Sequence, residues 1–75
     1  MGIIYPNVMA ELARHSLSVT TLSEYMGRTR QNVDNKLRGK NPMNHNDMKK
    51  IQAFILENGG EVLTLDYLFK TKADL

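Results

Sequence analysis

The sequence predicts a compact all-α domain of five helices, and three observations lead to this fold class. Glycine and proline residues divide the chain into five short pieces, and apolar residues recur within each piece at helical spacing. Side chains that commonly cap helices stand at the starts of these pieces. No alternating apolar run is long enough for a confident strand, and residues 61–65 are the only candidate for one.

The first helix is expected at about residues 7–15. Asn7 can cap it, and Glu11 lies early enough for its charge to suit the helix dipole. Val8 and Leu12 are four residues apart and form an apolar stripe, completed by either Met9 or Ala13.

The second helix is expected to begin after Ser18, with Thr21 and Glu24 as a competing capping box. Gly27 suits the left-handed position that ends a helix. The residues expected to face inward are Leu22, Tyr25 and Met26.

The third helix is expected to run from the cap Thr29 to Gly39, and it carries two apolar anchors, Val33 and Leu37. Every other position in it is polar: Arg30, Gln31, Asn32, Asp34, Asn35, Lys36 and Arg38.

The fourth helix is expected between its cap Asn44 and Gly59, and Asp47 lies at its third position in a near capping box. A short fifth helix is expected after Thr64. The residues expected to face inward in these two helices are Met48, Ile51, Phe54, Ile55, Leu65, Leu68 and Phe69.

The length of 75 residues predicts one domain over residues 1–75, with a core at about residues 4–70 and a frayed tail after it. Cysteine is absent, which excludes disulfides and cysteine-based zinc sites and fits a reducing cytoplasm. His15 and His45 lie far apart, so no metal site and no cofactor are expected. No catalytic triad, phosphate loop or acid pair is visible, and an enzyme is not expected. No apolar run approaches the roughly 20 residues needed to span a membrane.

The net charge of +2 is unevenly distributed. Residues 28–40 contain five cations and one anion, Asp34, a local charge of 5 − 1 = +4, whereas the rest of the chain carries −2. The five cations are Arg28, Arg30, Lys36, Arg38 and Lys40, which we call the basic block. Such a block suits a partner with concentrated negative charge, although a solvated surface is the alternative.

The polar third helix is poorly explained by core packing alone. Arginine, glutamine and asparagine can form paired hydrogen bonds with guanine and adenine edges in the major groove. An ordinary surface helix that only aids solubility is the alternative. Two short helices joined through Gly27, with a basic flank, favour a helix-turn-helix that contacts a partner.

The residues that carry this pattern are Leu17-Ser18, Leu22, Gly27, Thr29-Arg30, Val33 and the run Lys36-Leu37-Arg38-Gly39-Lys40. In this order they resemble the helix-turn-helix domain of phage repressors and Cro proteins, the XRE family. The resemblance extends over about residues 4–69 and implies a five-helix phage-repressor-like domain. It places base contacts on Arg30, Gln31 and Asn35, which we call the reading face. It places phosphate contacts near Ser18, Val19, Thr29, Asn32, Arg38, Lys40 and Asn41.

Two positions depart from the family pattern. Val19 stands where the family usually has a glutamine that braces the recognition helix and a phosphate. Asp34 places an anion on the third helix, which carries the reading face.

The resemblance implies a regulator of the lysis/lysogeny switch that binds double-stranded operator DNA in the cytoplasm of a bacterial host. A homodimer is one arrangement that it implies, with the chain past Gly60 as the interface. The alternative is an antirepressor, similar to the modulators of repression of lactococcal-type temperate phages. Such a protein binds the phage repressor through the same helix-turn-helix surface.

Overall fold

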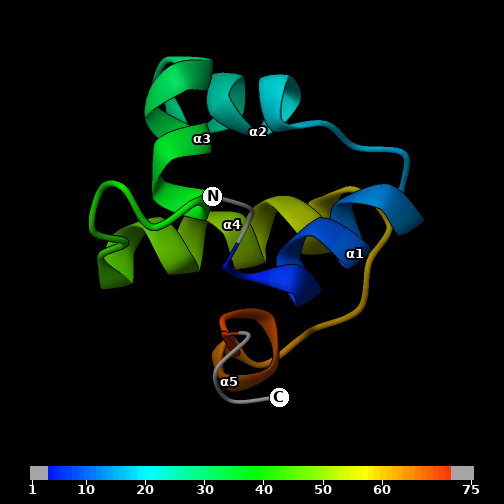
Figure 1. Cartoon of the computed structure of the whole chain (residues 1–75). Coiled ribbons are helices and arrows are strands. Elements are labelled where there is room, and N and C mark those ends of the chain that lie inside the picture. Colours follow the sequence, from blue (N-terminus) through cyan, green and yellow to red (C-terminus); the bar gives the residue numbers. More distant parts are fainter. Residues whose placement is uncertain (1–3, 72–75) are drawn as a thin grey trace.

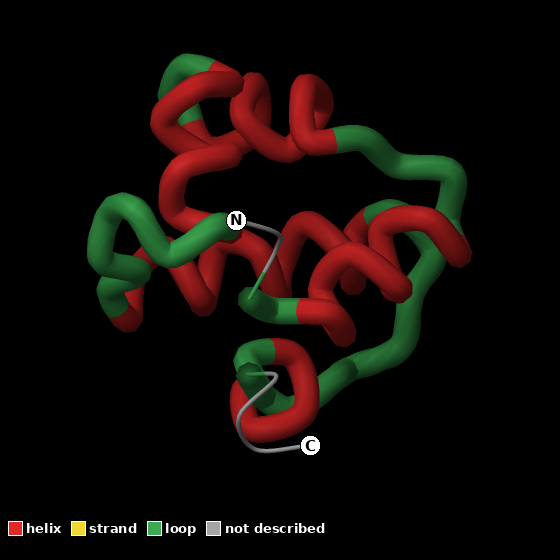
Figure 2. Tube along the Cα trace, viewed as in Figure 1, coloured by secondary structure: helices red, strands yellow, loops and turns green. Residues whose placement is uncertain are grey.

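The computed structural model describes residues 4–71, and these form five helices (Figure 1). The helices are α1 (Pro6–Arg14), α2 (Val19–Met26), α3 (Arg30–Leu37), α4 (His45–Glu57) and α5 (Leu65–Leu68). Figure 2 shows these residues as helices and loops without a strand, so the expected all-α class is confirmed. Within the described residues, the candidate strand at 61–65 is a loop that enters α5. Residues 72–75 of the expected tail lie outside the described range.

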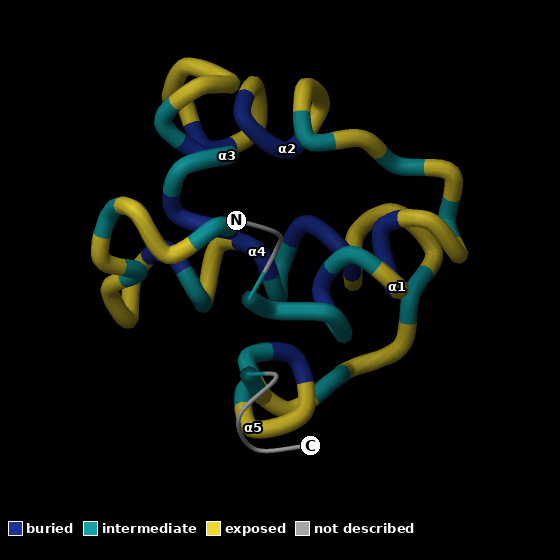
Figure 3. Tube along the Cα trace, in the orientation of Figure 1, coloured by how far each residue is buried: buried dark blue, intermediate teal, exposed yellow. Residues whose placement is uncertain are grey.

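Helix α4 lies in the middle of the fold, with α2 and α3 on one side and α5 on the other (Figure 1). Helix α2 contacts both α3 and α4, and α5 contacts both α4 and α1. Each helix contributes at least one buried residue, drawn dark blue in Figure 3. The apolar core consists of Val8, Leu12, Leu22, Met26, Val33, Leu37, Ile51, Phe54, Ile55 and Leu68.

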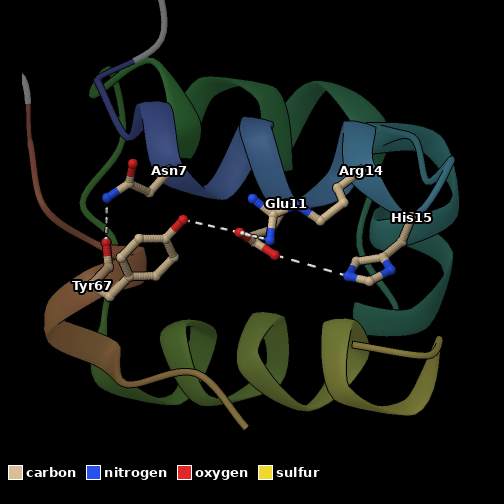
Figure 4. Close-up of polar contacts among 5 residues, drawn as sticks. All are labelled: Asn7, Glu11, Arg14, His15 and Tyr67. Carbon is tan, nitrogen blue, oxygen red and sulfur yellow. Dashed lines mark hydrogen bonds and ion pairs between the residues drawn. The ribbon is translucent and has the colours of Figure 1, made fainter. Parts of the chain in front are cut away.

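Four of the five expected helix caps are confirmed. Ser18, Thr29, Asn44 and Thr64 each accept a hydrogen bond from the backbone N–H three residues later. The cap predicted for the first helix was wrong, because α1 begins one residue before Asn7, at Pro6. Proline suits the first helical position, where its missing N–H would have no partner in the helix. The Asn7 side chain instead donates to the backbone oxygen of Tyr67, at 2.7 Å (Figure 4).

Glu11 plays a different part from the dipole role expected for it. Its side chain is buried between α1 and α5, where the Tyr67 hydroxyl donates to Oε2 at 2.9 Å (Figure 4). The same carboxylate lies 3.4 Å from Arg14 Nη1 and 3.8 Å from His15 Nε2. A buried carboxylate needs such partners to offset its lost hydration, so this cluster joins α5 to α1.

Tyr25 was wrongly predicted to face inward. Its ring packs against Phe54 at a centroid distance of 5.2 Å, yet the residue is 42% exposed. The hydroxyl donates to Glu57 Oε2 at 2.6 Å. A phenol needs a polar partner when its ring is packed, which places this side chain at the edge of the core rather than within it.

The two hydrogen-bonded tyrosines predict a loss of stability in alkali. The pKa of Tyr67 is raised above 10.0, first by its hydrogen bond to Glu11, then by burial and by the Glu11 charge. The pKa of Tyr25 is raised by its hydrogen bond to Glu57, then by burial and by the charge of Glu57. Because the unfolded chain then loses these protons first, the free energy of unfolding should fall as the pH rises past about 10.

Urea denaturation between pH 8 and pH 11 would measure this decline. Tyr67→Phe removes one of the two raised groups, so its stability should fall less steeply above pH 10 than that of the unmodified chain. Equal declines in the two proteins would show that the Tyr67 hydroxyl is not coupled to Glu11.

Candidate functional site

Helices α2 and α3 form a helix-turn-helix with a turn that Gly27 makes possible. Gly27 has a φ of +70°, in the left-handed region that residues with a Cβ enter only at a cost. Its N–H donates to Glu24 O at 3.2 Å, and the next N–H, of Arg28, donates to Ser23 O at 3.0 Å. These bonds satisfy the last carbonyls of α2 and turn the chain into α3.

The core fixes which side of α3 faces outward. Val33 and Leu37 are buried in one cluster with Leu22 and Met26 of α2, as expected. Side chains four residues apart lie on the same face of a helix, so burial of this pair leaves the N-terminal turn of α3 pointing to solvent. In Figure 3 this corner of the molecule, from the turn into α3, is drawn as exposed.

The structure brings the three residues of the reading face together. Arg30 and Gln31 are exposed in the first turn of α3, whereas Asn35, one turn later, is half-buried. Gln31 Nε2 donates to Asn35 Oδ1 at 3.1 Å. The two amides therefore support each other along the helix, and Arg30 and Gln31 are the side chains best placed to reach a partner.

The residues assigned to phosphate contacts lie in different environments. Ser18 and Thr29 use their hydroxyl oxygens to accept backbone hydrogen bonds at the starts of α2 and α3. Asn32 is half-buried, and its side-chain oxygen has no hydrogen-bond donor among the described residues. Lys40 is exposed, while Asn41 is half-buried in the loop after α3.

The place of Lys36 among the polar residues of α3 suggested that it would face solvent, but it does not. It is buried, and its Nζ pairs with Oδ2 of Asp47, which is 1% exposed in the first turn of α4. Arg28 Nη2 lies 3.5 Å from the other oxygen of the same carboxylate. Sequence reasoning assigned Asp47 only a place in the first turn of its helix, because local spacing gives no sign of a pairing across eleven positions.

The ion pairs leave the basic block less cationic than the sequence suggested. Arg38 Nε donates to Asp34 Oδ2 at 2.8 Å, so the anion on α3 is neutralised by its own helix. Arg30 and Lys40 are the members of the block that form no ion pair with residues 4–71. Counting the buried carboxylate of Asp47, the local charge falls from +4 to 4 − 1 = +3. The candidate contact surface is therefore polar and only moderately basic.

Val19 opens α2 with a half-buried apolar side chain that packs against the core. This side chain has no hydrogen-bonding group that could brace α3 or meet a phosphate.

Compared with known proteins, the chain matches no family model, no curated protein and no solved structure. The residues that the structure describes contain no pocket and no group of three or more side chains suited to hold a metal ion. None of the described helices has the length and apolar character needed to cross a membrane.

Proposed function

We propose that this protein is a regulator of a phage-type lysis/lysogeny switch and that it contacts its partner through α3. The observation that carries the proposal is the exposure of Arg30 and Gln31 in the first turn of α3, the second helix of a helix-turn-helix. The first turns of such helices reach the partner, because the rest of the helix is held against the core. Val33 and Leu37 hold α3 in that position here.

Operator DNA is the partner for which a helix-turn-helix is generally suited. Arg30 can form paired hydrogen bonds with guanine, and Gln31 with adenine, in the major groove. Lys40, exposed just past α3, is placed to meet a phosphate. These groups support sequence-specific contact with double-stranded DNA.

The second candidate partner is a phage repressor, and the ion pairs favour it. Three of the five cations of the basic block are paired with carboxylates, so few remain to neutralise phosphates. Most of the affinity for DNA comes from neutralising phosphates, whereas a protein interface uses mixed charges and amides. We therefore propose that the protein acts as an antirepressor, with tighter binding to the repressor than to the operator.

Salt dependence separates the two partners. Binding to a duplex that carries the operator should weaken as salt rises, with a logarithmic slope of about −0.9 for each phosphate contacted. With two unpaired cations on this surface, we expect a slope of about −2. Binding to the purified DNA-binding domain of the repressor should change mainly in its association rate.

Fluorescence titrations at 50 and 200 mM salt, against each partner in turn, would measure these slopes. Tighter binding to the repressor at the higher salt would support the antirepressor role. Tight operator binding with a slope near −5 would contradict it and would make DNA the main partner.

A further inference from the structure

One buried carboxylate collects two cations of the basic block. Asp47 lies in the first turn of α4, Lys36 in the last turn of α3, and Arg28 in the turn between α2 and α3. The three side chains meet although each residue belongs to a different segment of the chain. Asp47 is 1% exposed, so its charge acts on these two partners with little screening by solvent.

The two cations differ in how far their side chains are exposed to solvent. The side chain of Lys36 is 8% exposed, so it cannot reach a partner at all. The side chain of Arg28 is 38% exposed and lies two residues before Arg30, at the end of α3 that reaches the partner. Its side chain is long enough to contact a phosphate, but any movement of the guanidinium away from Asp47 leaves a buried carboxylate less well compensated.

We propose that Asp47 is a specificity-determining residue: it acts as an internal counter-ion that withholds Arg28 from DNA and so biases this surface towards a protein partner. The inference rests on the proposed function, because it assumes that α3 and its preceding turn form the contact surface. It also explains the preference for a protein partner, because that preference then depends on a residue that never contacts the partner.

All variants in this test carry Lys36→Met, so the loss of the Lys36–Asp47 pair is common to them. They differ in whether a carboxylate remains at position 47. Lys36→Met is the reference, because it replaces the buried ammonium by an apolar side chain of similar length. Lys36→Met/Asp47→Asn then removes the carboxylate and leaves Arg28 without an ionic partner. Lys36→Met/Glu61→Gln is the matched control, because it removes one carboxylate from an exposed position in the loop before α5 and changes the net charge by the same amount.

The measurement is binding to a mixed-sequence DNA duplex as a function of salt. The Lys36→Met/Asp47→Asn protein should bind several-fold more tightly than Lys36→Met, with a slope steeper by about 0.9, one additional phosphate contact. Lys36→Met/Glu61→Gln should show the slope of the reference. Equal slopes in the two double variants, or no detectable DNA binding by either, would overturn the proposal.

Single variants of the otherwise unmodified chain give an independent test that does not require a change at position 47. Arg28→Ala should leave the salt slope nearly unchanged, whereas Arg30→Ala should reduce it by about 0.9. A loss as large for Arg28→Ala as for Arg30→Ala would overturn the proposal, because Arg28 would then already contact phosphate. If Arg30→Ala weakens binding to neither DNA nor repressor, the proposed function itself fails. That outcome is distinct from failure of the counter-ion role alone.

Discussion

Replacing Asp47 by asparagine is expected to lower the free energy of unfolding by about 3 to 5 kcal/mol, the usual cost of leaving one member of a buried ion pair without its partner. The change preserves the shape of the side chain, so packing is retained and the loss comes from the uncompensated charge of Lys36. For a chain of this length, such a loss is a large part of the total stability. Urea denaturation followed by circular dichroism would measure it.

Two further variants show whether the loss comes from the pair. Glu61→Gln removes a carboxylate from an exposed loop position and should change stability by no more than about 0.5 kcal/mol. Adding Lys36→Met to Asp47→Asn removes the uncompensated ammonium and should recover most of the loss, because apolar replacement of a buried pair is often neutral. If Asp47→Asn cost less than about 1 kcal/mol, the pair would not be held away from solvent as described.

Replacing Arg30 or Gln31 by alanine is expected to weaken partner binding by about 1 to 3 kcal/mol, the range for a well-placed paired contact. Both residues are exposed, so stability should change by no more than about 0.5 kcal/mol. Lys70→Ala is a matched control for Arg30→Ala, because it removes one exposed cation two residues after the end of α5. Helix α5 lies on the opposite side of α4 from α3 (Figure 1).

Isothermal titration with the repressor domain and with an operator duplex would measure these losses. A large loss of stability with intact binding would mean that α3 is rotated relative to the orientation described here. An equal loss of affinity in Lys70→Ala would mean that net charge, rather than contact through the reading face, controls binding.

The helices could be predicted because their signals are local. The four caps that the sequence assigned correctly lie three residues from the N–H groups they accept from. The spacing of apolar residues identified every member of the core, but Met48 and Leu65, also expected to face inward, are only half-buried and lie outside that cluster. The error at Asn7 arose where two valid signals compete. Proline at the first helical position shifted the start of α1 by one residue, and this freed the asparagine side chain to bind α5.

The candidate site was predictable only in part, because its electrostatics depend on contacts between distant segments. The sequence correctly indicated that Arg30 and Gln31 lie off the core face of α3. It could not indicate that Lys36 would pair with Asp47, because the two residues lie eleven positions apart in different helices, with the loop at 38–44 between them. Glu11 and Tyr67 are a second such pair, 56 positions apart. The sequence indicated only a local role at a helix start for Asp47 and for Glu11. In the structure, Asp47 pairs with the ammonium of Lys36, and Glu11 accepts a hydrogen bond from the hydroxyl of Tyr67.

If the outward side of α3 is the contact surface of a switch regulator, as we propose, partner binding should perturb this side of the molecule first. The most direct measurement is an NMR titration of the ¹⁵N-labelled chain with the DNA-binding domain of the repressor, repeated with operator DNA. We expect saturable shifts centred on Thr29, Arg30 and Gln31, with the repressor as the tighter partner. Saturable binding with shifts confined to α1 and α5, or the absence of binding to both partners, would contradict this expectation.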